Sequence, residues 1–281
     1  MAAVPTGRPA GATRGGRGSV GIGAVVRSEW TKFRSVRSTT VSLLVMVVLI
    51  VGLGALSTAL TTANWSSTGP ADRLTFDPTN RSLVGILFGQ LAIGVLGVLV
   101  ISAEYGTGTI RATFAAVPRR PMVLMAKAVV FGAVGLLVSE VTAFAAFFVG
   151  QSLLTGATPH AVLSQPDVLR AVVGSGLYLA VLGLFGLGIA AIVRHTAGGI
   201  ATFVGLLLVL PLIVEALPSS IRDPVAKYLP AVIGEVMTSA VSARAARDFP
   251  VLGPWAGFGL LCAYAAAALV LGGIVVVRRD A

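Results

Sequence analysis

The sequence contains few charged residues. They make up 11% of its 281 positions, whereas 56% of the positions are hydrophobic. Soluble globular domains carry about 25% charged and about 45–50% apolar residues. Charges this sparse do not cover the surface of a soluble protein, and the apolar residues lie in long blocks rather than at helical spacing. Because a helix that crosses a bilayer needs about 20 mostly apolar residues, the composition predicts an integral membrane protein.

Motifs for ATP hydrolysis and metal binding are absent as well. A P-loop needs a Lys followed by Ser or Thr, but Lys32, Lys127 and Lys227 are followed by Phe, Ala and Tyr. The two histidines, His160 and His195, fall on opposite sides of the bilayer in the topology derived below, so they cannot share one ion. A single cysteine excludes an internal disulfide. We therefore expect no enzymatic activity, bound cofactor or metal in this chain itself.

Six apolar blocks predict six transmembrane helices. They lie near residues 41–62, 83–102, 128–150, 169–193, 198–217 and 255–277. Residues 1–23 are rich in Gly, Ala, Arg and Pro without apolar periodicity, which predicts a disordered basic tail. The sequence thus divides into this tail and an all-α, six-span domain over residues 24–281.

The basic residues predict the orientation, because cytoplasmic loops of membrane proteins carry an excess of Lys and Arg. With a cytoplasmic N-terminus, 14 of the 21 basic residues lie inside and 7 outside. Both termini are then cytoplasmic. The net charge of +10 follows from this bias, and no aromatic stacking pattern accompanies it, so we expect a lipid bilayer and not a nucleic acid as partner. The outer segment 218–254 contains an amphipathic portion, which predicts a short helix that caps the bundle or dips into the membrane.

The segment before the first span, VVRSEWTKFRSVRS, has the pattern of an amphipathic helix. Val26, Trp30 and Phe33 recur at spacings of four and three residues and share one helix face. Basic side chains such as Lys32 and Arg34 project elsewhere. This pattern favours a helix in the membrane interface, with a solvated basic linker as the alternative.

Between the second and third spans lies a charged segment, EYGTGTIRATFAAVPRR, residues 104–120. The hydroxyl of Thr107 or Thr109 is expected to cap a helix start by accepting a hydrogen bond from a free backbone N–H. Pro118 is expected to end that helix, because it has no N–H and disfavours helical geometry before it. The segment therefore predicts one short helix in the cytoplasm.

This short helix is predicted to be amphipathic. Ile110, Phe114 and Val117 recur at helical spacing and form one apolar stripe. Arg119 and Arg120 follow the predicted helix end, where positive charge is favourable. Such a helix either lies on the lipid headgroups or docks onto another protein.

The stretches SEWTKFRSVRSTT and EYGTGTIRATFAAVPRRPMVLMAKAVV resemble the permease subunits of ABC type 2 exporters, in particular actinobacterial members. The resemblance covers roughly residues 24–280, including the span count and the long last outer loop. Its motif positions here are Glu104, Gly108, Thr109, Pro118, Arg120 and Lys127.

The resemblance implies that two permease subunits, identical or related, form the pathway in the bacterial plasma membrane. Two separate ATPase subunits bind ATP and Mg²⁺ below them. The helix after the second span is implied to be the coupling helix that seats in the ATPase, with Ile110, Arg111 and Phe114 beside the motif residues. The interfacial helix with Trp30 and Phe33 is implied to pack next to it.

Two polar residues fall inside the spans. An acid such as Glu140 in the third span costs about 2.5–3.5 kcal/mol on insertion scales, so it is either a pathway residue or a protonated, hydrogen-bonded link between helices. Gln90 in the second span is interpreted as an interhelical hydrogen-bonding residue. The alternatives to an exporter permease are an ion-gradient-driven transporter that uses Glu140, and a non-transporting scaffold or sensor. No residue pattern identifies a substrate, so a hydrophobic drug, a lipid-linked molecule and a peptide antibiotic stay open.

Overall fold

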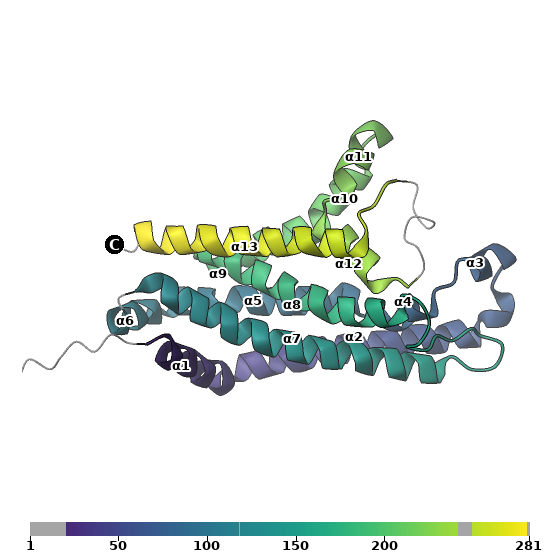
Figure 1. Cartoon of the computed structure of the whole chain (residues 1–281), viewed down its shortest axis with the longest axis horizontal. Helices are drawn as coiled ribbons and strands as arrows, with labels where there is room; N and C mark the ends of the chain where they lie inside the picture. Colours follow the sequence, from purple (N-terminus) through teal and green to yellow (C-terminus); the bar gives the residue numbers. More distant parts are fainter. Residues whose placement is uncertain (1–20, 118, 241–248, 280–281) are drawn as a thin grey trace, which may run out of the picture.

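Residues 21–117, 119–240 and 249–279 are described by the computed structural model, and they form helices joined by turns and loops (Figure 1). Pro118, the tail up to residue 20 and segment 241–248 lie outside the described residues. Helix α1 begins at Ile22, two residues before the predicted domain boundary at residue 24.

Six helices of the described part are long and apolar enough to cross a membrane. They are α2 (Arg37–Ala63), α5 (Ile86–Thr107), α7 (Arg120–Leu153), α8 (Val168–Val193), the continuous run of α9 (Thr196–Val204), η2 (Gly205–Val209) and α10 (Leu210–Glu215), and α13 (Pro254–Arg279). The predicted all-α fold with six spans is therefore confirmed. Several helices extend beyond the apolar blocks, because the charged residues at their ends also adopt helical structure.

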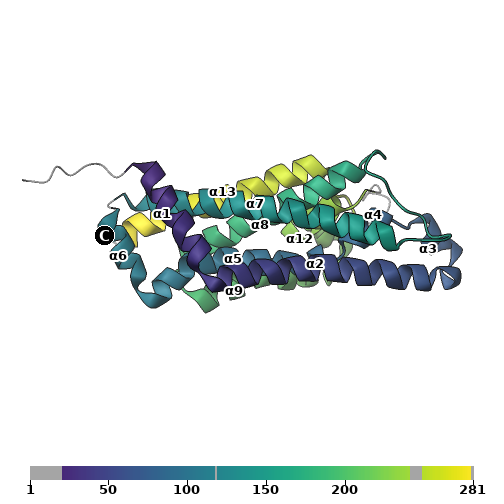
Figure 2. The same ribbon diagram turned by 90° about the horizontal axis from the view of Figure 1, so that it is seen from below.

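Short helices gather at the two ends of the long bundle. At one end lie α1 (Ile22–Ser35), α6 (Thr109–Ala116) and the end of α13, as both views show (Figures 1 and 2). At the other end lie η1 (Trp65–Ser67), α3 (Pro70–Leu74), α4 (Pro78–Leu83), α11 (Ser219–Ala226) and α12 (Pro230–Thr238). The first and last described residues thus lie at the end that carries α6.

Helix α8 occupies the centre of the bundle. Its apolar window is 67% buried inside the chain, against 22% for α2 and for the fifth span. Small residues allow this position: a Cβ on Gly97 would meet the carbonyl of Gly183, and a Cβ on Gly186 would meet that of Gly94. Such contacts let the α5 and α8 backbones approach closely, as is common between membrane helices.

A buried hydrogen bond also joins these two helices. The Tyr178 hydroxyl of α8 donates to Gln90 Oε1 of α5 at 2.6 Å. Gln90 in turn donates from Nε2 to the carbonyl of Leu87 at 3.0 Å. The interpretation of Gln90 as an interhelical hydrogen-bonding residue is therefore confirmed.

The fifth span contains a π-helical turn, η2, directly before Pro211. Proline has no N–H, and its ring clashes with the carbonyl four residues earlier. The backbone widens to accommodate it, and the N–H of Leu210 bonds to the carbonyl of Gly205, five residues back. The span therefore stays continuous through its proline.

The outer segment forms α12, as the amphipathic pattern indicated, but α12 is buried. Met237 packs against Gly174 and Gly234 packs against the ring of Tyr178, so α12 sits on α8. Ser239, just beyond α12, donates to Asp77 Oδ2 at 3.0 Å, and Asp77 also caps α4. This helix therefore caps the bundle.

The close α5–α8 contact predicts a stability difference between two glycine substitutions. Gly186→Ala places a methyl group against the Gly94 carbonyl, and overpacking of this kind costs about 1–3 kcal/mol. Gly259→Ala on α13 meets open space and serves as the control. Thermal unfolding in mild detergent should show a lower Tm for Gly186→Ala only. Equal Tm values for the two variants would contradict the close packing.

Candidate functional site

The connection between α5 and α6 is a single residue, Gly108. Its φ of +73° lies in the left-handed region, which glycine adopts without strain. Gly108 occupies the N-cap position of α6 and no side chain caps the helix, so the predicted threonine cap is wrong. The Thr107 hydroxyl instead donates to the carbonyl of Ala103 at 2.9 Å and lies 2.9 Å from the hydroxyl of Thr109. Because a left-handed residue turns the chain at once, α6 follows α5 without a loop.

A buried lysine joins three helices at this end of the bundle. Lys127 of α7 lies 2.7 Å from Glu29 Oε2 of α1 and 2.6 Å from Glu104 Oε1 of α5. The side chain of Lys127 is only 3% exposed, and that of Glu29 only 6%. Glu104 and Lys127, 23 residues apart in the sequence, are therefore brought together by folding.

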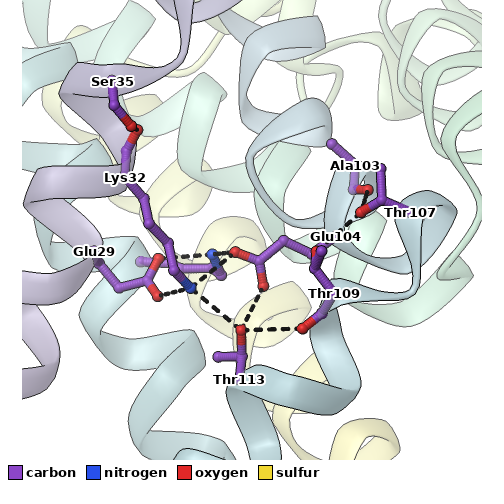
Figure 3. Close-up of polar contacts among 9 residues, drawn as sticks. Glu29, Lys32, Ser35, Ala103, Glu104, Thr107, Thr109 and Thr113 are labelled. Carbon is purple, nitrogen blue, oxygen red and sulfur yellow. Dashed lines mark hydrogen bonds and ion pairs between the residues drawn. The ribbon is translucent and has the colours of Figure 1, made fainter.

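A second lysine extends this network to α6 (Figure 3). Lys32 Nζ lies 2.9 Å from Glu29 Oε1 and 3.2 Å from Glu104 Oε1, and it donates to Thr113 Oγ1 at 3.2 Å. Burial lowers the pKa of Lys32, but the hydrogen bond to Glu29 and the charges of both carboxylates outweigh it, so that pKa lies above its usual range. Lys32 therefore carries a positive charge at neutral pH.

These four ionisable groups and one hydroxyl are called the ion-pair network below. Its members are Glu29, Lys32, Glu104, Thr113 and Lys127. Two carboxylates face two ammonium groups, so the network is electrically balanced. Removing one partner of a buried pair leaves an uncompensated charge, which typically destabilises a protein by about 3–5 kcal/mol. The network therefore holds the ends of α1, α5, α6 and α7 in one arrangement.

Helix α1 packs on the bundle through a face that contains Glu29 and only part of its apolar pattern. Val25, Glu29 and Phe33 point into the protein, and the Phe33 ring packs edge-on against Phe131 of α7 at 6.3 Å between centroids. Trp30 is 47% exposed. Glu29 therefore faces the bundle, where it meets its ion-pair partners, and Trp30 lies outside this face. Arg34 is also exposed.

The apolar stripe of α6 faces the protein. Ile110 is buried, and Phe114 is half-buried beneath the Arg120 guanidinium, 5.6 Å from its ring centroid. Arg119 and Arg120 follow the end of α6, as predicted, and Arg120 is also the first residue of α7. Arg111 and Ala115 are exposed on the outward side. The surface that α6 offers to a partner is therefore small and basic.

The turn between α8 and α9 lies against the same end of α5. The Arg194 guanidinium sits 4.9 Å from the ring centroid of Tyr105, the neighbour of Glu104. His195 caps α9 by accepting a hydrogen bond from the Gly198 N–H at 3.2 Å. The second turn on this side of the bundle is therefore also packed against α5, next to the network.

Glu140 does not belong to the network. It lies 13 residues beyond Lys127 on α7, about 20 Å along the helix at 1.5 Å per residue. Its carboxyl group packs against Gly176 of α8, is half-buried, and makes no hydrogen bond to any residue that the structure describes. Glu140 is thus placed at the contact between α7 and α8.

Two members of the network, Glu29 and Thr113, are absent from the site that the sequence predicts. A signal for Glu29 exists in the sequence: the predicted cytoplasmic side has many basic residues but only three acids, Glu29, Glu104 and Asp280. Acids so rare on a basic side are candidates for ion pairs. Thr113 carries no comparable signal.

Comparison with protein families identifies a family that matches most of the chain. A family described as ABC-2 family transporter protein matches residues 25–214, which covers α1 and the first five spans and includes every member of the ion-pair network. Comparison with curated proteins gives no match.

The burial of Lys127 predicts its importance for stability. Lys127→Met leaves Glu29 and Glu104 with only Lys32 and should destabilise the protein by about 3–5 kcal/mol. Lys227→Met, the same change at a lysine that lies over the Tyr228 ring at the other end, is the control. Thermal unfolding in mild detergent measures both variants.

A double variant measures the interaction energy between Glu29 and Lys127. Because Glu29 and Lys127 are in contact, the loss in Glu29→Gln/Lys127→Met should be smaller than the sum of the two single losses by about 0.5–3 kcal/mol. Additive losses, or a Lys127→Met protein as stable as wild type, would show that the network does not hold this end together.

Proposed function

The chain belongs to the ABC-2 transporter family, and on that premise we propose that it is the transmembrane subunit of an ATP-driven exporter that couples through α6 to a separate ATPase. The family match and the six spans make it the membrane component of a transporter. None of its three lysines lies in a P-loop. ATP and Mg²⁺ are therefore assigned to the partner chain.

The ion-pair network is the observation that carries this proposal. Thr113 of α6 is bound to Lys32 of α1, and both are linked through Glu104 to Lys127 of α7. A force on α6 therefore acts on α5 and α7, the spans on either side of it, and on α1, which leads into α2. Because Glu29 and Lys127 are buried and the charges of the network are balanced, the network is suited to transmit a displacement of α6.

The outward side of α6 is the proposed contact with the ATPase. Arg111, Ala112 and Ala115 are exposed there, and small side chains next to one arginine suit a shallow groove with acidic or carbonyl groups. Phe114 and Ile110 lie on the inward side and support the position of α6 from within. ATP-driven closure of the ATPase pair pushes α6, and the network passes that movement to the spans.

A second permease subunit is part of the proposal. The spans α2 and α9–α10 bury the smallest share of their residues within the chain, 22% each, and expose large apolar side chains such as Val48 and Leu212. These two peripheral spans are free to form a pathway with an identical or related chain. Both termini and α6 are assigned to the cytoplasm of a bacterial plasma membrane, following the positive-inside bias.

We keep Glu140 as the candidate for a polar residue that lines the transport pathway. Its carboxyl group has no hydrogen-bond partner among the described residues, yet Gly176 leaves room for it between α7 and α8. This is the one feature that also suits an ion-gradient-driven transporter. The presence of an ATPase partner would distinguish the ATP-driven exporter from the ion-gradient-driven transporter.

Co-purification from the native host tests the coupling proposal. A P-loop ATPase should accompany the tagged wild-type chain in near-equal amounts, and the purified complex should hydrolyse ATP. Arg111→Glu/Ala115→Glu should abolish that association, because it reverses the charge of the exposed face of α6 without touching its buried side. Mass spectrometry and an ATPase assay measure the two results.

Arg81→Glu provides the matched control, since Arg81 is exposed on α4 at the opposite end of the bundle. It should leave the association intact. The double variant should unfold at the wild-type temperature. If no ATPase accompanies the wild-type chain, even after crosslinking in the membrane, or if the double variant retains it, the coupling role of α6 is wrong.

A further inference from the structure

An apolar groove runs between the ends of α7 and α13 that lie beside α6. Its volume of about 580 Å³ falls within the roughly 300–1,000 Å³ typical of ligand pockets. The apolar lining comes mainly from Leu124, Met125, Leu269, Val270, Ile274 and Val277. The only charged side chain in the lining is Arg278.

The way α13 packs explains why the groove stays open. Gly272 of α13 packs against Ala191 of α8, and Gly188 of α8 packs against Ala268 of α13, so α13 follows α8 closely. Helix α7 lies on the other side of the groove, where Leu124 approaches Gly273. Figure 1 shows that α7 and α13 come closest at the end that carries α6 and that α8 lies between them further along the bundle. The two helices are therefore held by α8, and glycine leaves the space between them unfilled.

The groove opens toward the membrane. Both of its walls belong to spanning helices, and the rim residues Met125 and Val270 are 56% and 62% exposed. No described part of the chain covers them. The groove is thus accessible to the hydrocarbon chains of the leaflet that adjoins α6.

Arg278 gives the groove a charged end. It is exposed and makes no hydrogen bond or ion pair with any residue that the structure describes. A guanidinium group binds phosphate oxygens through two parallel hydrogen bonds, and basic pockets between transmembrane helices on the cytoplasmic side bind anionic headgroups. An apolar groove with an unpaired arginine at the headgroup level matches a lipid with an acyl chain and a phosphate.

A second copy of the chain fits the same groove poorly. Two copies related by a twofold axis along the membrane normal would bring both Arg278 side chains to the same end of one interface. The described acids at that end, Glu29 and Glu104, are already paired with lysines. Among the residues that the structure describes, no free acid would then stand between the two guanidinium groups.

We propose that this groove binds one anionic phospholipid, with an acyl chain between α7 and α13 and its phosphate on Arg278. The bound lipid fills the space beside Leu124 and Gly273 and links α13 to the part of α7 that carries Lys127. The site is separate from the exposed face of α6, so it does not depend on the ATPase contact.

Native mass spectrometry of the full chain, purified in mild detergent, tests the site. Phosphatidylglycerol and phosphatidylcholine with the same acyl chains are added in turn. Wild type should retain one phosphatidylglycerol about fivefold more tightly than phosphatidylcholine, the effect of one basic residue near an anionic lipid. Arg278→Gln should reduce phosphatidylglycerol binding to the phosphatidylcholine level. Arg37→Gln, at an exposed arginine that begins α2, should change neither.

A groove-filling variant tests the acyl-chain part. A Cβ on Gly273 would make only an ordinary contact with Leu124, at 3.8 Å, so Gly273→Leu projects into the groove and should weaken binding of both lipids. Gly259→Leu on the same helix points into open space and should leave binding unchanged. Arg278→Gln does not disturb packing, so the charge test stands even if Gly273→Leu fails to fold.

Three results would overturn the proposal. Equal retention of the two lipids by wild type would show that the arginine does not select an anionic headgroup. Unchanged phosphatidylglycerol binding in Arg278→Gln would place the lipid elsewhere. Efficient disulfide formation between copies that carry Val270→Cys in a Cys262→Ala background, in the membrane, would show that a second chain covers the groove.

Discussion

Charge compensation inside a low-dielectric environment is the constraint on which one end of this protein depends. Lys127 is almost fully buried and is held by Glu29 and Glu104 from two other helices. A buried charge without such partners destabilises a fold strongly, so arrangements of α1, α5 and α7 that separate these charges are disfavoured. Lys32 and Thr113 then bring α6 into the same arrangement. The position of α6 therefore depends on the ion pairs that Lys32 and Glu104 form.

The middle of the bundle is stabilised by close helix packing instead of ion pairs. Charges are nearly absent there, and glycines let the backbones of α5, α8 and α13 approach closely. Association of helices in lipid relies on such packing and on a few hydrogen bonds, of which the Tyr178–Gln90 bond is an example. The core around α8 is therefore rigid, while α2 and the fifth span remain at the periphery.

The six spans and the all-α fold followed from the apolar blocks, because a bilayer admits few other structures. The short helices α1 and α6 were also predicted, from periodicity and from a proline. One detail of α6 was wrong, because Gly108 and not a threonine stands at the start of that helix. The left-handed turn at Gly108 outweighed the local capping pattern there. The inward position of Glu29 on α1 had no signal in the apolar periodicity, because it depends on ion pairs with distant helices.

The sequence by itself determined the membrane class, the number of spans, the charge bias between the two sides and the resemblance to the transporter family. These properties depend on composition and on residues close together in the chain. Only the tertiary structure decided that Glu29 pairs with Lys127, that Ile110 faces inward while Arg111 faces outward, and that a groove with an arginine at its end lies between α7 and α13. These contacts join residues that lie far apart in the sequence; Glu29 and Lys127, for example, are 98 positions apart. They depend on how helices rotate to bury charges and small side chains against one another, and no local pattern contains that information.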